Sequence, residues 1–176
     1  MSEIERLVWE PVTPSMVALP VAAALAGWPR QPEVRAAAID PDVADTAAFC
    51  RRYGIALEDS ANCVVIAGRR GNETRYAVCV VLATTRADVN GVVRRRLEAR
   101  KASFAPMDAA VALTSMEYGG ITPIGLPPGW PVLVDDAVLK RDVVVIGSGL
   151  RSSKLSLPAG HLVELREADV VPGLAA

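Results

Sequence analysis

The chain has 176 residues, of which 51% are hydrophobic, and its 19 Lys and Arg nearly balance its 20 Asp and Glu, giving a formal net charge of −1. That length suits one domain with its own core, and the composition is too apolar and too evenly charged for a disordered protein. The near-zero charge also excludes a protein that coats nucleic acid through bulk positive charge.

Residues 1–44 are rich in proline and alanine, and we expect them to pack as an N-terminal arm against a domain formed by residues 45–176. Nineteen uncharged residues lie between Glu10 and Arg30, which approaches the length of a membrane span, but four prolines interrupt them. The acidic stretch before them differs from the basic start of a signal peptide. We therefore predict a short helix over residues 21–26 and no membrane segment.

The next part of the chain, residues 45–116, carries regular helical and strand patterns. Asp45 can cap a helix that Gly54 ends, because a carboxylate accepts helix N–H groups and glycine readily adopts the left-handed conformation. Two β-branched runs on either side of a short polar turn predict a β-hairpin over residues 63–83. The remaining predicted elements are a helix over 89–101, a strand over 102–105 and a helix over 107–116.

The last third of the chain begins with residues 117–130, which contain too much glycine and proline for regular structure. Beyond them we predict strands over 131–134, 143–146, 155–157 and 168–171, and a short helix over 158–165. Because strands and helices do not alternate as βαβ units, the sequence predicts an α+β fold with a mixed sheet.

Cysteine and histidine are scarce, which excludes several kinds of site. Cys50, Cys63 and Cys79 are odd in number and widely spaced, so they predict a reduced, cytoplasmic protein rather than a disulfide framework. Cys63 and Cys79 lie in apolar runs and are expected in the core. His161 is the single histidine, and we expect it at the surface or at a helix end. The sequence therefore offers no zinc cluster and predicts no metal and no cofactor.

Charge is unevenly distributed along the chain. Residues 31–59 contain three basic and six acidic side chains, whereas residues 86–101 contain six basic and two acidic ones. On the predicted helix, Arg96 and Arg100 are i,i+4 neighbours of like charge, which costs about 0.2–0.5 kcal/mol. Two interpretations stay open: a solvated helix face, or a basic stripe that contacts phosphates and makes binding salt-dependent.

Two glycine-rich segments have the composition of ligand-binding loops. The segment GGITP, residues 119–123, has two glycines that let the backbone approach a ligand closely, and a proline that stiffens its exit. The segment GSG, residues 147–149, directly follows a predicted strand, and its backbone N–H groups are expected to form a nest for an oxyanion or a phosphate. Each segment alone is also typical of an ordinary tight turn.

Together with the sequence around them, these two segments resemble the YbaK/prolyl-tRNA-synthetase-associated editing domains. The resemblance covers about residues 45–171, and it rests on the order and spacing of several motifs and on a GG-x-[ST]-P-x-G core. The matching motifs are SANCVVIAG (60–68), ATTRADVNGVVRRRLEARKASFAP (83–106), EYGGITPIGLP (117–127), PVLVDD (131–136) and VVVIGSGLRSSKLSL (143–157).

The resemblance implies a fold, a reaction and a substrate. The fold is a mixed, barrel-like sheet flanked by helices, and the reaction is hydrolysis of mischarged aminoacyl-tRNA by a free-standing deacylase. Deacylation needs a positioned water and donors for the developing oxyanion, without a metal or a histidine. The residues implied around the terminal adenosine of tRNA are Gly119, Gly120, Ile121, Thr122 and Pro123, and those beside the aminoacyl ester are Gly147, Ser148 and Gly149.

One position departs from the pattern of the family. Many active relatives carry a lysine in the first strand, where this chain has Asn62, and an amide supplies no fixed positive charge. Lys101 and Lys154 are the candidates to replace that lysine, although both are expected at the surface. Asn62 joins the GSG residues as a catalytic candidate, and the expected substrate contacts include Arg94, Arg95, Lys101 and Lys154.

Three functions stay open on this basis. The first is a free-standing deacylase that acts on the 3′ end of a mischarged tRNA. The second is a non-catalytic module that binds tRNA or adenosine and has lost its chemistry with the lysine. The third is a small-molecule hydrolase without an RNA partner. The sequence predicts no particular amino acid, tRNA or oligomeric state.

Overall fold

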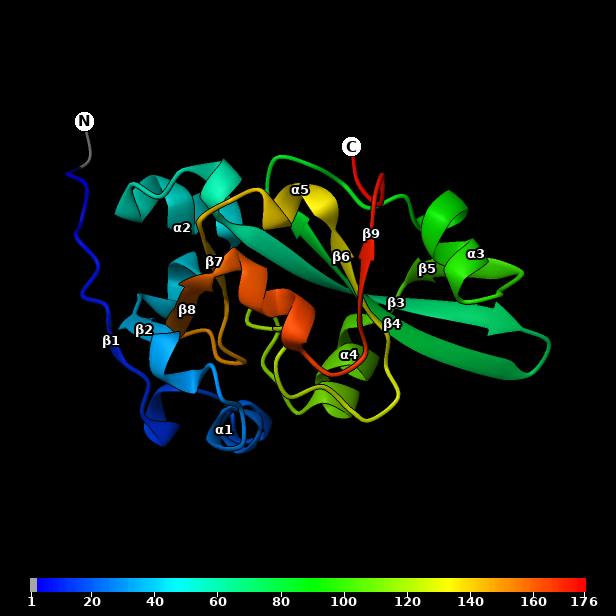
Figure 1. Cartoon of the computed structure of the whole chain (residues 1–176), viewed down its shortest axis with the longest axis horizontal. Helices are drawn as coiled ribbons and strands as arrows, with labels where there is room; N and C mark the ends of the chain where they lie inside the picture. The colour runs from blue at the N-terminus through cyan, green and yellow to red at the C-terminus, as the bar shows by residue number, and fades with distance from the viewer. Residues whose placement is uncertain (1–2) are drawn as a thin grey trace.

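The computed structural model describes residues 3–176, and its α+β fold is built on two β-sheets (Figure 1). The first sheet is antiparallel and joins β1 (Glu10–Pro11), β2 (Arg35–Ala38), β8 (Ser153–Pro158) and β7 (Val143–Gly147) in that order. The second is mixed and joins β5 (Lys101–Phe104), β3 (Ala61–Arg70), β4 (Glu73–Leu82), β6 (Val132–Asp135) and β9 (Ala168–Val171). In the second sheet β3 pairs antiparallel with β4 and β5, whereas the pairs of β6 are parallel.

Short helices connect and flank these strands. The α-helices are α1 (Leu19–Ala26), α2 (Thr46–Tyr53), α3 (Arg94–Arg96), α4 (Met107–Thr114) and α5 (Asp136–Leu139). The 3₁₀ turns are η1 (Pro14–Met16), η2 (Gln31–Glu33), η3 (Pro41–Val43), η4 (Leu57–Asp59) and η6 (Ala159–Glu164), and η5 (Val89–Val93) is a π-helical turn. Over the part of the chain that the structure describes, no helix has the length and apolar character needed to cross a membrane.

The predicted helix after Asp45 is confirmed, and both of its ends form as the sequence indicates. The Asp45 carboxylate accepts a hydrogen bond from the Ala48 N–H at 3.3 Å, and Gly54 ends the helix with a φ of +66°. Phe49 and Tyr53 lie on the buried face, where their rings pack against each other 5.4 Å apart. Asp45 therefore fixes where α2 begins and Gly54 fixes where it ends. The N-terminus of α2 borders the candidate site described below.

The β-hairpin and the later strands are also confirmed. β3 and β4 pair over their whole length, from Ala61 opposite Leu82 to Arg70 opposite Glu73, and the tip of the hairpin projects at the right of Figure 1. Residues 117–130 form no helix or strand, as their glycines and prolines predict. The helices predicted over 21–26 and 107–116 appear as α1 and α4.

The prediction of one helix over residues 89–101 is wrong. The chain forms η5 and the single turn α3, and it leaves the helix after Leu97, because Glu98 adopts a left-handed conformation with a φ of +52°. Residues 101–104 form β5, which pairs with β3. The backbone N–H of Arg100 already donates a hydrogen bond to the Arg69 carbonyl. Arg96 and Arg100 therefore do not share a helix face.

Residues 3–44 contribute to the first sheet as well as to the main core. β2 lies between β1 and β8, with Ala37 opposite Lys154, so this segment supplies an inner strand. Val21 and Leu25 of α1 are buried with the residues of both sheets. We propose that the arm folds only together with residues 45–176.

The two sheets come together where β3 begins. Ser60 forms an isolated parallel bridge with Val145 of β7, and beyond this bridge the two strands belong to different sheets. The predicted α+β fold with a mixed sheet flanked by helices is confirmed. Within residues 3–176 the two sheets share the main core without closing into a barrel.

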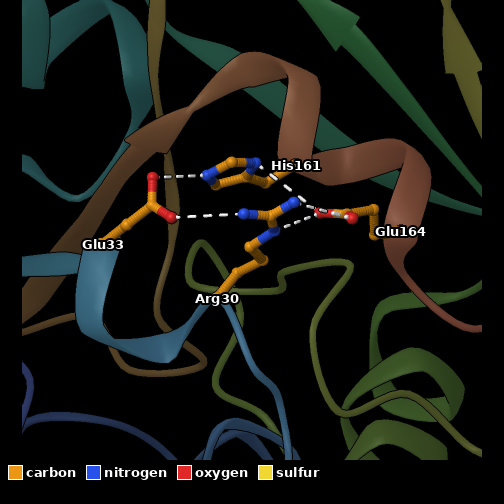
Figure 2. A network of polar contacts seen from close by, with 4 residues as sticks. All are labelled: Arg30, Glu33, His161 and Glu164. Atoms are coloured by element: carbon orange, nitrogen blue, oxygen red, sulfur yellow. Dashed lines mark hydrogen bonds and ion pairs between the residues drawn. The ribbon is translucent and has the colours of Figure 1, made fainter.

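A polar network fastens the N-terminal segment to η6 (Figure 2). The Arg30 guanidinium contacts Glu164 at 2.6 Å and Glu33 at 3.5 Å. His161 lies 2.7 Å from the other carboxylate oxygen of Glu33 and 3.6 Å from Glu164. The single histidine is thus a largely buried member of this polar network, and it joins η6 to Glu33, which lies far away in sequence.

Candidate functional site

A cavity of about 550 Å³ lies beside the first half of β3, next to the point where the two sheets diverge. The starts of α2 and α4 form two of its walls, and the GGITP segment and the ends of β7 and β8 complete it. β5 pairs with β3 only from Ile66 onward, so this edge of β3 faces the cavity instead of another strand.

The two glycine-rich segments pack backbone to backbone at one side of this cavity. The Gly149 N–H donates a hydrogen bond to the Gly120 carbonyl at 2.6 Å, and the Glu117 N–H donates to the Gly149 carbonyl at 2.8 Å. A Cβ atom at Gly147 would lie 2.5 Å from the Gly120 oxygen, and one at Gly120 would lie 2.6 Å from the Leu150 oxygen. Both positions therefore require glycine, because larger residues would push the segments apart.

The expected open nest at residues 147–149 is not formed. The Gly149 N–H is already used by Gly120, and the fully buried Ser148 hydroxyl is bonded to Ser153 and to the Leu150 backbone. Of the three residues, only Gly147 lines the cavity. Ser148 and Gly149 stabilise the loop through these hydrogen bonds. This structural role differs from the direct contact with the aminoacyl ester that the resemblance implies.

Asn62 lies on β3 in the wall of the cavity and is half-buried. The hydroxyl of Thr46, in the first turn of α2, donates a hydrogen bond of 2.6 Å to its Oδ1 atom. This bond occupies the acceptor end of the amide and leaves the NH₂ group as the donor that a ligand can reach. Asn62 is thus oriented by the same helix whose N-terminus borders the cavity.

The prediction that Lys154 lies at the surface is wrong. Its side chain is 6% exposed and lines the cavity from β8. The ammonium donates one hydrogen bond, of 3.1 Å, to the Ala44 carbonyl, and it lies 5.2 Å from the centre of the Phe49 ring. Burial lowers the pKa of Lys154, and the nearby Cys50 and Asp45 partly oppose this shift. An ammonium has three N–H donors, so this buried cation has capacity for a ligand oxygen.

A family model for the aminoacyl-tRNA editing domain matches residues 40–165, which is well over half of the chain. The chain belongs to the aminoacyl-tRNA editing domain family. This confirms the resemblance read from the two glycine-rich segments and their neighbours. No curated protein matches the sequence of this editing domain.

Solved structures share the fold of the editing domain. A proposed trans-editing enzyme for prolyl tRNA synthetase gives a TM-score of 0.74 at 19% identity, and the match covers 92% of this chain and 97% of that chain. A scaffold from computational epitope grafting gives 0.74 at 21% identity with the same coverage. The hypothetical protein APE2540 gives 0.71 at 21% identity, covering 81% of this chain and 91% of that chain.

The GGITP segment of the editing domain divides between the cavity and the core. Gly119, with a φ of +83°, and Ile121 line the cavity. Thr122 and Pro123 are buried outside it, and the Thr122 hydroxyl has no hydrogen-bond partner among residues 3–176. The segment therefore reaches the cavity through Gly119 and Ile121.

Three further residues of the cavity were missed by sequence reasoning. The Arg151 guanidinium donates to the Tyr118 carbonyl at 3.0 Å and to the Pro41 carbonyl at 2.8 Å, which ties the GGITP segment to η3. The side chains of Phe104 and Tyr118 line the same cavity yet are 62% and 55% exposed. These residues lie in loops or at a strand end, where hydrophobic periodicity carries no signal; the only signal was their place inside the family motifs.

Cys63 also lines the cavity, but its chemistry is unsuited to nucleophilic attack. Desolvation strongly raises the pKa of the Cys63 thiol, so the nucleophilic thiolate is disfavoured. No group of three or more His, Cys, Asp or Glu side chains in the described part of the chain is arranged to hold a metal ion.

Three of the four basic residues expected to contact substrate, Arg94, Arg95 and Lys101, lie outside the cavity. Arg94 and Lys101 line a second hollow at the edge of the second sheet, and this hollow shares no lining residue with the cavity. Arg95 is exposed and lines neither of them. Of the two lysines that could replace the family lysine, only Lys154 lines the same cavity as Asn62.

Proposed function

We propose that this editing domain is a free-standing deacylase that hydrolyses the ester of a mischarged aminoacyl-tRNA. One observation carries the proposal: the cavity beside the family's glycine-rich segments contains a buried cation, Lys154, and an oriented amide, Asn62. The family, and a fold shared with a proposed trans-editing enzyme, support this proposal. Such a reaction belongs in the cytoplasm, where aminoacyl-tRNA is used.

The proposed reaction is attack of water on the ester. The water oxygen adds to the carbonyl carbon, and negative charge develops on the carbonyl oxygen. The buried Lys154 ammonium and the half-buried Asn62 NH₂ group are the donors in the cavity that can stabilise this charge. The bond between the carbonyl carbon and the ribose oxygen then breaks, and the proton lost by the attacking water passes to that ribose oxygen. This releases the amino acid and a tRNA with a free terminal hydroxyl.

The rim of the cavity fits the nucleoside that carries the ester. Phe104 and Tyr118 expose aromatic rings there, and base–aromatic stacking contributes about 1–3 kcal/mol per base. Arg151 holds the Tyr118 backbone in place through its carbonyl. The apolar side chains deeper in the cavity, among them Val65, Ala110 and Ile121, then contact the amino acid and select it by size.

The test is a panel of mischarged aminoacyl-tRNAs incubated with the wild-type domain and with Lys154→Gln. We expect hydrolysis of at least one member, and a loss of about 100-fold in kcat for the variant, as for removal of one oxyanion donor. Lys140→Gln, which changes an exposed lysine outside the cavity, is the matched control. Thermal unfolding of Lys154→Gln and of Lys154→Met separates loss of chemistry from loss of the fold.

The second candidate function is a binding module without catalysis, and the amide at position 62 favours it. That module would bind deacylated tRNA but would turn over none of the panel, and Asn62→Lys would create hydrolysis. Absence of turnover across the whole panel with wild-type protein would exclude the deacylase. Absence of tRNA binding as well would exclude both candidates.

A further inference from the structure

The second hollow of the editing domain is surrounded by positive charge. It has a volume of about 480 Å³ and lies at the edge of the second sheet, where β3, β5, η5 and α3 meet. Four cationic side chains line it: Arg69, Arg94, Arg100 and Lys101. We call these four residues and the hollow between them the basic groove.

The charges of the basic groove are not neutralised by the protein. Within residues 3–176, none of the four side chains lies within 4.0 Å of a carboxylate, although Arg75 and Arg96 on neighbouring elements form ion pairs with Glu73 and Asp169. Arg69 and Lys101 stand directly opposite each other in the β3–β5 pair. Like charges at such positions destabilise a sheet, so a bound anion would relieve an unfavourable contact.

The lining of the groove suits phosphate groups better than bases. Its other members are Asn90, Ser103 and two alanines, without an aromatic ring on which a base could stack. Arg94 donates from Nε to the Asn90 carbonyl at 2.8 Å, which fixes the guanidinium and leaves its outer nitrogens as a fork. Guanidinium forks match the geometry of phosphate oxygens.

The groove and the cavity are connected by β5. Phe104 lines the cavity and Lys101 lines the groove, three residues earlier on the same strand, which corresponds to about 10 Å. A nucleic acid whose terminal ester enters the cavity must continue over neighbouring surface. The unpaired positive charge closest along this strand is that of the groove.

We propose that the basic groove binds the phosphate backbone of the acceptor end of tRNA while the terminal ester lies in the cavity. The inference rests on the proposed function, since it takes tRNA as the substrate. It replaces the basic helix expected from the sequence with a groove at a sheet edge, and it adds Arg69 and Arg100 to the residues that hold RNA.

The test measures binding of deacylated tRNA by the full chain over a series of salt concentrations. Replacing Arg69 and Lys101 together by Gln should lower affinity at least tenfold at low salt, and should reduce the slope of log K against log salt by about two. Arg70→Gln is the matched control, because Arg70 is exposed on the next position of β3 and does not line the groove. We expect that control to bind as wild type does.

Hydrolysis of an aminoacyl ester of adenosine distinguishes failure of this inference from failure of the proposed function. That substrate reaches only the cavity, so the double variant should hydrolyse it at the wild-type rate while its KM for aminoacyl-tRNA rises. Equal tRNA affinity and salt slope in the double variant and in Arg70→Gln would overturn the groove, whether or not the domain is catalytic. The proposal for the groove would also be overturned if the wild-type domain did not bind tRNA but bound vesicles of anionic lipid.

Discussion

Burying a lysine ammonium costs free energy unless other groups replace the hydrogen bonds that it makes with water. Lys154 is buried and has few such groups around it. One carbonyl and the face of one ring contact it, and desolvation lowers its pKa. A ligand that brings a carbonyl or anionic oxygen would supply a further partner. The burial that disfavours the Lys154 ammonium therefore favours binding of a ligand oxygen beside it.

The sequence could not locate Lys154, because β8 is an inner strand that is covered on both faces. Ser153, Lys154 and Leu155 are consecutive and all buried, so the strand shows no alternation that would mark a lysine as inward-facing. The glycine-rich segments could be found, since the need for glycine is set by local backbone geometry. The spacing of the two segments did not reveal which of their N–H groups form hydrogen bonds between them.

Gly149 gives a prediction that belongs to a single residue. Gly149→Ala should destabilise the domain by about 2 kcal/mol or more, because φ is +86° and the new Cβ would lie 2.4 Å from the Ala18 Cβ. Gly129→Ala is the control, since φ there is +79° but no atom lies within 4 Å. Urea unfolding of both variants separates strain from close packing. Equal losses of unfolding free energy in the two variants would show that Ala18 moves aside, and that close packing at Gly149 adds nothing to the cost.

At the scale of elements, the apolar spacing of residues 89–97 correctly identified the buried face but not the length of the helix. Val89, Val93 and Leu97 do pack together in one cluster. The helix stops because residues 101–104 pair with β3, and that pairing depends on a strand more than thirty residues earlier. Local periodicity contains no information about such a partner, so the basic residues were assigned to the wrong kind of surface.

The start of η5 gives a prediction at this scale. The Asp88 carboxylate accepts hydrogen bonds from the N–H groups of Gly91 at 3.0 Å and Val92 at 3.1 Å. Asp88→Ala should therefore cost about 0.5–2 kcal/mol in the free energy of unfolding. Asp108→Ala is the control, because Asp108 lies in the first turn of α4 without a capping hydrogen bond among the described residues. Urea unfolding measures the free energy of unfolding of both variants. An equal loss in the two would show that the capping hydrogen bonds of Asp88 do not stabilise the domain.

At the scale of the whole molecule, residues far apart in sequence depend on each other for their positions. Residues 35–38 provide the strand beside Lys154, and Ala18 and Val21 of the N-terminal segment pack against Gly149. The cavity is therefore supported by the N-terminal segment, although the residues that line it lie within or next to the family motifs. Sequence patterns predicted that an arm would pack here, but the strand order that places it inside the sheet is a long-range property.

The network of Arg30, Glu33, His161 and Glu164 predicts how this assembly responds to acid (Figure 2). The hydrogen bond with His161 lowers the pKa of Glu33, and the hydrogen bond from Arg30 lowers the pKa of Glu164. A carboxyl group with a lowered pKa stabilises the fold above its ordinary value of 4.5, and this contribution is lost as the pH falls through the lowered pKa. Relative to wild type, the double variant Glu33→Gln/Glu164→Gln should thus be less stable at neutral pH, and the gap should close in acid. Urea unfolding from neutral to acidic pH measures the gap, with Glu58→Gln as the control for an exposed carboxylate. A gap that stays constant into acid would show that these charges do not fasten the N-terminal segment.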